Sequence, residues 1–158
     1  MSKSSSGLDT LNDGPLPEVE VYTDGGCDPN PGPGGWGAVL RTGEHARTLS
    51  GRQASTTANA MLIRGATGAL KALNRPCQVA LYSDAKYLVQ GASQWVRGWQ
   101  SRGWRTRDGK PVANQAEWQA LLEAARPHDV AWLLAQGDAV PDDMERAGEL
   151  ASQAASLQ

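Results

Sequence analysis

Phenylalanine is missing from this chain of 158 residues, and cysteine and histidine occur only twice each. So few thiols exclude a disulfide-rich scaffold. Cys27 and Cys77 lack the close spacing of metal-binding pairs, so a reduced protein is the simplest interpretation, and one disulfide between them stays open. Also missing are an apolar run long enough to span a membrane and the apolar core of a secretory signal. We therefore expect a cytoplasmic protein that does not contact a membrane.

The chain also lacks an excess of basic residues. Its 15 lysines and arginines stand against 17 acidic residues, which gives a net charge of −2 at pH 7. Dedicated nucleic-acid binders are usually basic, so this balance counts against tight binding of nucleic acid. A local basic patch can override it, because affinity depends on the few phosphates that are contacted.

What is present fits one domain, large enough to bury a core without a disulfide or a metal. We expect a disordered tail over residues 1–17, the folded domain over 18–153 and a short tail over 154–158. The apolar pattern predicts an α/β fold in which a mixed sheet is flanked by helices. The predicted strands are 18–24, 36–41, 46–51, 78–83 and 130–134, and the predicted helices are 57–73, 86–90, 94–101, 114–125 and 141–153.

The most informative segment covers residues 21–37 and reads VYTDGGCDPNPGPGGWG. Its apolar start ends at Asp24, and a turn rich in glycine and proline leads into a second apolar run. A carboxylate at the end of a strand suits a metal ligand, because the sheet fixes its backbone while its side chain faces solvent. The glycines of this segment, Gly25 among them, have no Cβ and would let a nucleic-acid backbone or a second strand approach closely. A surface aspartate bound by turn amides explains a lone Asp-Gly pair equally well.

This segment resembles the first motif of the ribonuclease H type 1 family, in which a strand-end aspartate precedes a glycine, a small residue and Asn-Pro-Gly-Pro-Gly-Gly. Here Asp24-Gly25-Gly26 and residues 30–35 match that motif, and the resemblance continues to about Ala151. It implies a ribonuclease H-like fold with a five-stranded mixed sheet. It also implies an endonuclease that cuts the RNA strand of RNA–DNA hybrids with the help of a divalent metal.

Two of the four metal-binding carboxylates of that family are missing here. The resemblance implies that Asp24 and Asp84 are catalytic and metal-binding residues, but it places Leu62 and Gly148 at the other two positions. Because neither replacement offers a side-chain oxygen, we expect no two-metal cluster. Two carboxylates with waters can still hold one Mg²⁺ or Mn²⁺ weakly.

Other acids near the C-terminus are candidates to replace the ligand lost at Gly148. Asp138 stands where the family has a mobile histidine, and Glu145 lies three residues before Gly148, on roughly the same helix face. Glu149 lies about 100° round the helix from Gly148. No acid stands near Leu62, so the ligand lost there has no local replacement.

The resemblance also implies a groove that reads the hybrid through its backbones and 2′-hydroxyl groups. Ala58 and Ala60 replace an asparagine and an arginine of the family pattern, which should remove hydrogen bonds to the substrate, whereas Lys86 could add a phosphate contact. Turn and helix-cap chemistry explains the retained Asn30 and Asn59 equally well. The candidate substrate-binding residues next to the acids are Gly25, Asn30, Thr57, Asn59 and Lys86.

Residues 94–110 resemble the basic protrusion that some family members use to grip the DNA strand. Trp95 and Trp99 are four residues apart and so share one helix face, and we expect the tryptophans of this segment to pack together. Its arginines are expected to form a nonspecific phosphate-binding patch. The candidates are Arg97, Arg102 and Arg105.

Three hypotheses follow from the sequence. The first is a ribonuclease H homologue directed at RNA–DNA hybrids, with hydrolysis weak or absent. The second is an active hybrid endoribonuclease with an altered ligand set built on Asp24 and Asp84. The third is a non-catalytic scaffold or interaction domain, because a fold alone does not fix a function. We expect a monomer, and a dimer through one surface stays open.

Overall fold

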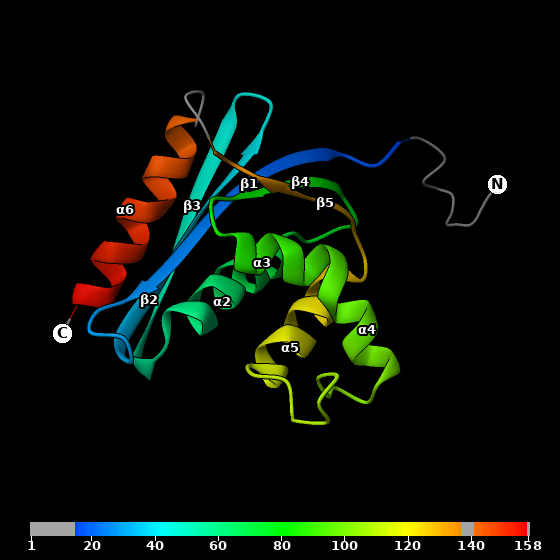
Figure 1. Ribbon diagram of the computed structural model, residues 1–158. Helices are drawn as coiled ribbons and strands as arrows, with labels where there is room; N and C mark the ends of the chain where they lie inside the picture. The colour runs from blue at the N-terminus through cyan, green and yellow to red at the C-terminus, as the bar shows by residue number, and fades with distance from the viewer. Residues whose placement is uncertain (1–14, 137–140, 158) are drawn as a thin grey trace.

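The computed structural model describes residues 15–136 and 141–157. Within them, one five-stranded sheet is flanked by helices (Figure 1). The strands are β1 (Glu18–Cys27), β2 (Gly32–Thr42), β3 (His45–Thr56), β4 (Gln78–Ser83) and β5 (Asp129–Leu134). The helices are α2 (Ala58–Lys71), α3 (Lys86–Gln90), the π-helical turn η1 (Gly91–Trp95), α4 (Val96–Ser101), α5 (Gln115–Ala125) and α6 (Asp142–Ser156).

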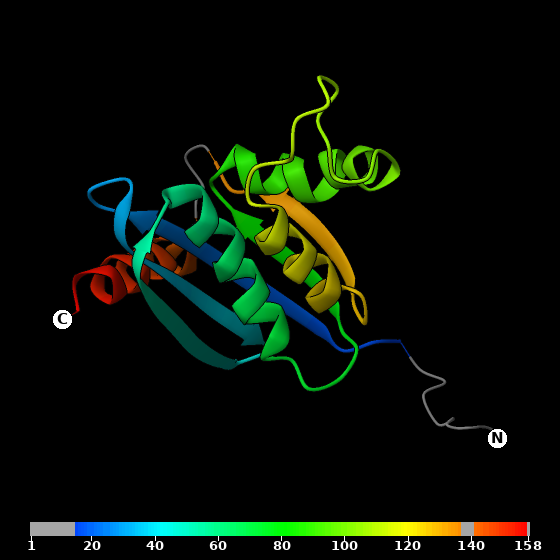
Figure 2. The same cartoon turned by 90° about the horizontal axis from the view of Figure 1, so that it is seen from below.

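The strands lie in the order β3-β2-β1-β4-β5. The first three pair antiparallel through short turns, whereas β1, β4 and β5 pair parallel. Parallel neighbours need long connections, which α2 and the helices α3 to α5 supply. These helices cover one face of the sheet and α6 covers part of the other (Figures 1 and 2). The predicted mixed sheet flanked by helices is thus confirmed.

The glycine- and proline-rich segment forms more strand than its composition predicts. β2 begins at Gly32 instead of residue 36, and Gly34 and Gly35 pair with Cys27 and Gly26 of β1. The expected long turn therefore shrinks to four residues between the strands. Strand pairing is favoured here because neighbouring elements pack directly onto these glycines. Helix α6 packs onto Gly35, whereas Thr56 of β3 and Met61 of α2 pack onto Gly34, so the missing side chains become part of the packing.

Two helical boundaries also differ from expectation. The helices predicted at 86–90 and 94–101 are joined without a break by η1, where the ring of Trp118 occupies the place that a side chain on Gly91 would fill. At the C-terminus, α6 continues to Ser156, three residues beyond the predicted end. Ala154 is one of the buried residues of this helix, and residues 154–156 of the tail predicted over 154–158 are helical. Of the predicted N-terminal tail, residues 1–14 lie outside the described residues.

The hydrophobic core fills both sides of the sheet. On the face that α2 and α5 cover, Val21 and Leu81 pack with Ile63 of α2 and with Trp118 and Leu121 of α5. A second, smaller cluster lies under α6 and consists of Tyr22, Val39, Ala135, Met144 and Ala147. The larger core fixes α2 on β1, and the smaller one fixes α6 on β1 and β2.

Helix α6 lies unusually close to the sheet. A Cβ atom on Gly35 would lie 2.5 Å from the Ala151 carbonyl oxygen, and one on Gly37 would lie 2.5 Å from that of Ala147. Real Cβ atoms do not approach so closely, so only glycine fits under this helix. The close approach carries Gly148 to the end of β1, where the candidate site lies.

Candidate active site

Asp24 is at the centre of the candidate site. Its strand turns Tyr22, Asp24 and Gly26 towards α6, and the side chain is half-buried there. The Gly25 amide donates a 2.8 Å hydrogen bond to its Oδ1. Its pKa is raised to about 6, mainly by burial and also by the charge of Asp84, against the lowering effect of the Gly25 bond. A carboxylate whose ionisation is opposed by burial and by a neighbouring charge is typical of functional sites.

Asp84 comes from the next strand of the sheet. It follows the end of β4, which pairs parallel with β1, so the two strands bring their carboxyl ends to the same edge. The Asp84 side chain is exposed, and no hydrogen bond holds its carboxylate among the described residues. The charge of Asp84 acts on Asp24, as the pKa of Asp24 shows. The structure therefore brings the two predicted acids together.

The two replaced positions converge on the same point. Gly148 of α6 faces Asp24, since a Cβ atom on Gly148 would lie 3.1 Å from Asp24 Oδ2. Leu62 of α2 lies behind Gly25, where a Cβ atom on Gly25 would come within 2.7 Å of the Leu62 backbone nitrogen. The Leu62 side chain is buried, with 8% of its surface exposed. All four positions of the family pattern thus surround one site, and two of them supply oxygen atoms.

This donor set does not fit a two-metal cluster. Over residues 15–136 and 141–157, no group of three or more acidic, histidine or cysteine side chains is placed to hold a metal ion. Two ions close together need more negative charge than two carboxylates provide. The donor chemistry of Asp24 and Asp84 suits at most one hydrated ion of the Mg²⁺ type.

The candidate replacement ligands do not change this conclusion for the described residues. Glu145 and Glu149 are exposed, and Glu149 lies 3.5 Å from Arg146 in an ion pair. Among the described carboxylates, Asp84 alone shifts the pKa of Asp24. Asp138 lies outside the described residues.

A cavity of about 280 Å³ opens beside Asp24. Gly148 and Ala151 line it from α6, while Cys27 at the end of β1 and Asp28 in the following turn line it from the sheet. The sequence interpretation missed the two hydroxyl groups that α6 contributes. The signal was available, because Ser152 and Ser156 follow Gly148 at intervals of four residues and therefore share its helix face.

Three of the five predicted substrate-binding residues next to the acids have local structural partners. The Asn30 side chain accepts a 3.2 Å hydrogen bond from the Ala58 amide, and Thr57 caps α2 by accepting one from Ala60. The close approach that Gly25 permits is that of the α2 backbone. Cap and packing chemistry therefore accounts for these three residues. The other two, Asn59 and Lys86, are exposed at the starts of α2 and α3.

The basic segment after α3 is built around packed tryptophans, as expected. The ring centroid of Trp99 lies 5.9 Å from that of Trp95 and 6.2 Å from that of Trp104. Two of the predicted phosphate-binding arginines brace the same loop. The Arg102 side chain donates to the Arg105 carbonyl at 3.2 Å, and the Arg105 side chain donates to the Gly109 carbonyl at 3.0 Å.

Arg97 differs from these two arginines. It is exposed on α4 and has no hydrogen bond or ion pair within the described part of the chain. Among the three predicted arginines, it is therefore the one whose side chain is available to a ligand.

The expectations about cysteines and membranes can also be compared with the structure. Cys27 and Cys77 are both free thiols, so the disulfide that the sequence left open does not form. The Cys27 thiol donates to nearby backbone carbonyls, among them that of Gly32 at 3.2 Å. Among residues 15–136 and 141–157, no helix combines the length and the apolar character needed to cross a bilayer.

β1 continues three residues beyond Asp24, where the sequence predicted its end, and Asp84 directly follows β4. The sheet order and these two carboxylates define a ribonuclease H-like fold. Comparison with known families agrees, since the family model described as RNase H matches residues 17–156. The chain belongs to the ribonuclease H family.

Individual relatives support this assignment. The chain is 55% identical over 135 residues to a ribonuclease H of Symbiobacterium thermophilum, covering 85% of this chain and 92% of that protein. It is 47% identical over 140 residues to a ribonuclease H of Novosphingobium aromaticivorans, covering 89% and 98%. Among solved structures, it resembles LC9-RNase H1, a type 1 RNase H with the type 2 active-site motif. That match has a TM-score of 0.80 and 30% identity, and it covers 91% of this chain and 74% of the other.

The raised pKa of Asp24 predicts the effect of Asp24→Asn on stability. Between about pH 4 and 6 the folded state binds more protons than the unfolded state, so stability falls as the pH rises through this window. Above it, the half-buried charge is a net cost that asparagine removes. After allowance for solvent screening, we expect a gain of about 1–2 kcal/mol in the free energy of unfolding at pH 7.5. Urea unfolding at pH 7.5 and at pH 4 measures it.

Asp84→Asn is the matched control for this measurement, because Asp84 is exposed at the same edge of the sheet. Removing the Asp84 charge only relieves its effect on Asp24, so we expect a smaller gain. The gain of Asp24→Asn should disappear at pH 4. An equal gain at both pH values would show that the Asp24 charge is not the cause.

Proposed function

We propose that this protein binds RNA–DNA hybrids as a ribonuclease H does, and that its metal-dependent hydrolysis of the RNA strand is weak or absent. The ribonuclease H relatives support the choice of substrate. The weak or absent hydrolysis is inferred from the composition of the site. Gly148 faces Asp24 and Leu62 lies behind Gly25, and neither position has a side-chain oxygen.

The expected loss of hydrolysis follows from charge. Cutting a phosphodiester with two ions requires one ion to activate water and the other to stabilise the leaving oxygen. With two carboxylates, the site holds at most one Mg²⁺ or Mn²⁺, and weakly. The remaining capacity is binding, which depends on the surface around the site.

The direct test is cleavage of a labelled RNA–DNA hybrid in Mg²⁺ and in Mn²⁺, with Asp24→Asn as the control. We expect no more product from the unaltered protein than from the variant in either metal. Cleavage that disappears in Asp24→Asn would instead establish the altered ligand set, for which Asp138 and Glu145 are the next residues to replace. In that case hybrid binding stands and the proposed impairment is wrong.

Hybrid binding itself is tested at Arg97. We expect Arg97→Gln to weaken binding several-fold and to lower the slope of log affinity against log salt by about 0.9, the contribution of one phosphate contact. Fluorescence anisotropy with a labelled hybrid at several salt concentrations measures both quantities. Arg75→Gln is the control, because Arg75 is exposed just before β4, far along that strand from Asp84. Binding that does not depend on salt in the unaltered protein would favour a scaffold instead.

A further inference from the structure

Helix α6 packs on one face of the sheet but leaves β4 and β5 uncovered there. We call this uncovered part the outer face of β4 and β5. The strands on which α6 packs are β1, β2 and β3. Of the β5 side chains on this outer face, Ala131 and Leu133 are exposed. Exposed alanine and leucine on a sheet face are apolar surface without a partner in the described chain.

The strand register arranges this face in three rows across β1, β4 and β5. The first row is polar and consists of Glu18, Gln78 and Asp129. The second row is Glu20, Ala80 and Ala131, and the third is Tyr22, Tyr82 and Leu133. Tyr22 and Tyr82 stack with ring centroids 4.9 Å apart. The face therefore changes from acidic at one end to apolar at the other.

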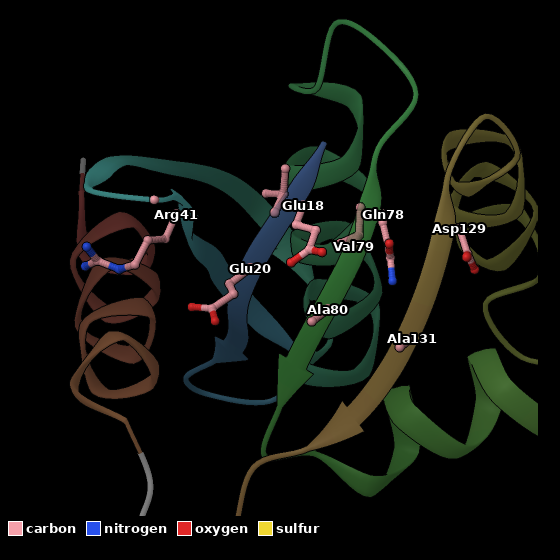
Figure 3. A pocket seen from close by; sticks show the side chains of 10 residues that line it. Glu18, Glu20, Arg41, Gln78, Val79, Ala80, Asp129 and Ala131 are labelled. Carbon is pink, nitrogen blue, oxygen red and sulfur yellow. The ribbon is translucent and has the colours of Figure 1, made fainter. Parts of the chain in front are cut away.

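A hollow of about 500 Å³ lies over the first two rows. Figure 3 shows why, because Ala80 and Ala131 form a low floor while Glu18, Glu20 and Asp129 stand around it. Arg41 lines the hollow on the side of α6. Its guanidinium pairs with Asp143 through bonds of 2.8 and 3.0 Å, and its charge also acts on Glu20, so it does not neutralise Glu18 and Asp129.

We propose that this face is a docking surface for a basic, amphipathic segment of a partner protein. A bulky apolar side chain would fill the hollow over the two alanines, and flanking lysines or arginines would pair with Glu18, Glu20 and Asp129. Complementary charge steers such a segment and fixes its orientation, while the apolar floor supplies the burial.

The proposal goes beyond hybrid binding and does not depend on it. The basic segment with Arg97 packs in the layer of α2 to α5, on the other side of the sheet (Figure 2). Phosphates would be repelled by Glu18, Glu20 and Asp129, which excludes a nucleic acid as the occupant. Asp24 shares this face but lies beyond the row of Tyr22, four residues along β1 from Glu20, so the hollow and the candidate active site occupy different parts of the face.

The test uses the full chain and a fluorescein-labelled amphipathic peptide built from lysine, leucine and alanine as the probe. Anisotropy gives the affinity, and amide chemical shifts locate the peptide. We expect shifts concentrated at residues 78–82 and 129–133. The triple variant Glu18→Gln, Glu20→Gln, Asp129→Asn should weaken binding by about tenfold. Ala131→Trp keeps the acids but fills the hollow, and it should also weaken binding.

The control removes the same charge elsewhere, through Asp108→Asn, Glu123→Gln and Glu149→Gln, all at exposed positions. It should leave peptide affinity within about twofold, since only long-range attraction is lost. The salt-dependent hybrid affinity of the first triple variant should not fall. Equal losses in the two triple variants, or shifts that map to another face, would overturn the proposal. So would equal binding of a peptide in which glutamate replaces every lysine.

Discussion

The double variant Leu62→Glu, Gly148→Asp is expected to cleave RNA–DNA hybrids in Mg²⁺ faster than the unaltered protein by at least about 10²-fold. Both replacements lie at the site already, because Gly148 faces Asp24 Oδ2 and Leu62 lies against Gly25. Four carboxylates would offset the charge of two ions. An ion that stabilises transition-state charge contributes several kcal/mol, and about 3 kcal/mol corresponds to this factor.

Single-turnover cleavage of a labelled hybrid measures the gain. The matched control is Leu62→Gln, Gly148→Asn, which changes size and polarity in the same way but adds no charge. It should show no gain. If the charged double variant gains nothing either, although it folds and binds hybrid, the polar contacts that align the substrate have been lost as well. Ala58 and Ala60 are the positions where the sequence indicates such a loss.

Stability gives a second readout of the same double variant. Without metal, the added carboxylates lie beside the half-buried Asp24, and like charges that cannot move apart are destabilising. Mg²⁺ should therefore raise the melting temperature of the double variant more than that of the unaltered protein, because an ion that binds only the folded state stabilises it. This shift separates failure to bind metal from failure to align substrate.

Much of the fold could be predicted from the sequence. The apolar runs predicted two strands that end at Asp24 and just before Asp84, and the family resemblance implied that these two aspartates belong to one site. Family resemblance made this prediction specific, since periodicity alone does not give the strand order. The structure confirms the sheet and brings the two acids together.

What the sequence could not supply was the effect of tertiary contacts on locally ambiguous residues. Gly34 and Gly35 are typical of a turn, yet they form strand because α6 fits over Gly35 while Thr56 and Met61 pack against Gly34. Gly91 should weaken a helix, yet the chain stays helical because Trp118 packs where its side chain would be. Asn30 suits a substrate contact or a helix cap equally well. In this structure its side chain accepts a hydrogen bond from the Ala58 amide at the start of α2, which is a capping role. In each case a distant element settles a choice that neighbouring residues leave open.

The close packing of α6 predicts a large effect of Gly37→Ala on stability. The added methyl group would lie 2.5 Å from the Ala147 carbonyl oxygen and 2.8 Å from the Ala151 amide nitrogen, both of which are helix backbone. Since backbone cannot rotate away as a side chain does, α6 must shift. We expect a loss of about 3 kcal/mol in the free energy of unfolding, at the upper end of overpacking costs. Urea unfolding measures it.

Gly26→Ala is the matched control, because Gly26 lies on the same face of the sheet and nothing lies within 4 Å of the Cβ position. It should be neutral or slightly stabilising, since alanine reduces the freedom of the unfolded chain.

The two glycines also separate stability from function. In the background of Leu62→Glu, Gly148→Asp, a shifted α6 carries residue 148 away from Asp24, so Gly37→Ala should abolish the restored cleavage even at temperatures where the protein stays folded. Retained cleavage would show that the position of α6 does not control the fourth ligand.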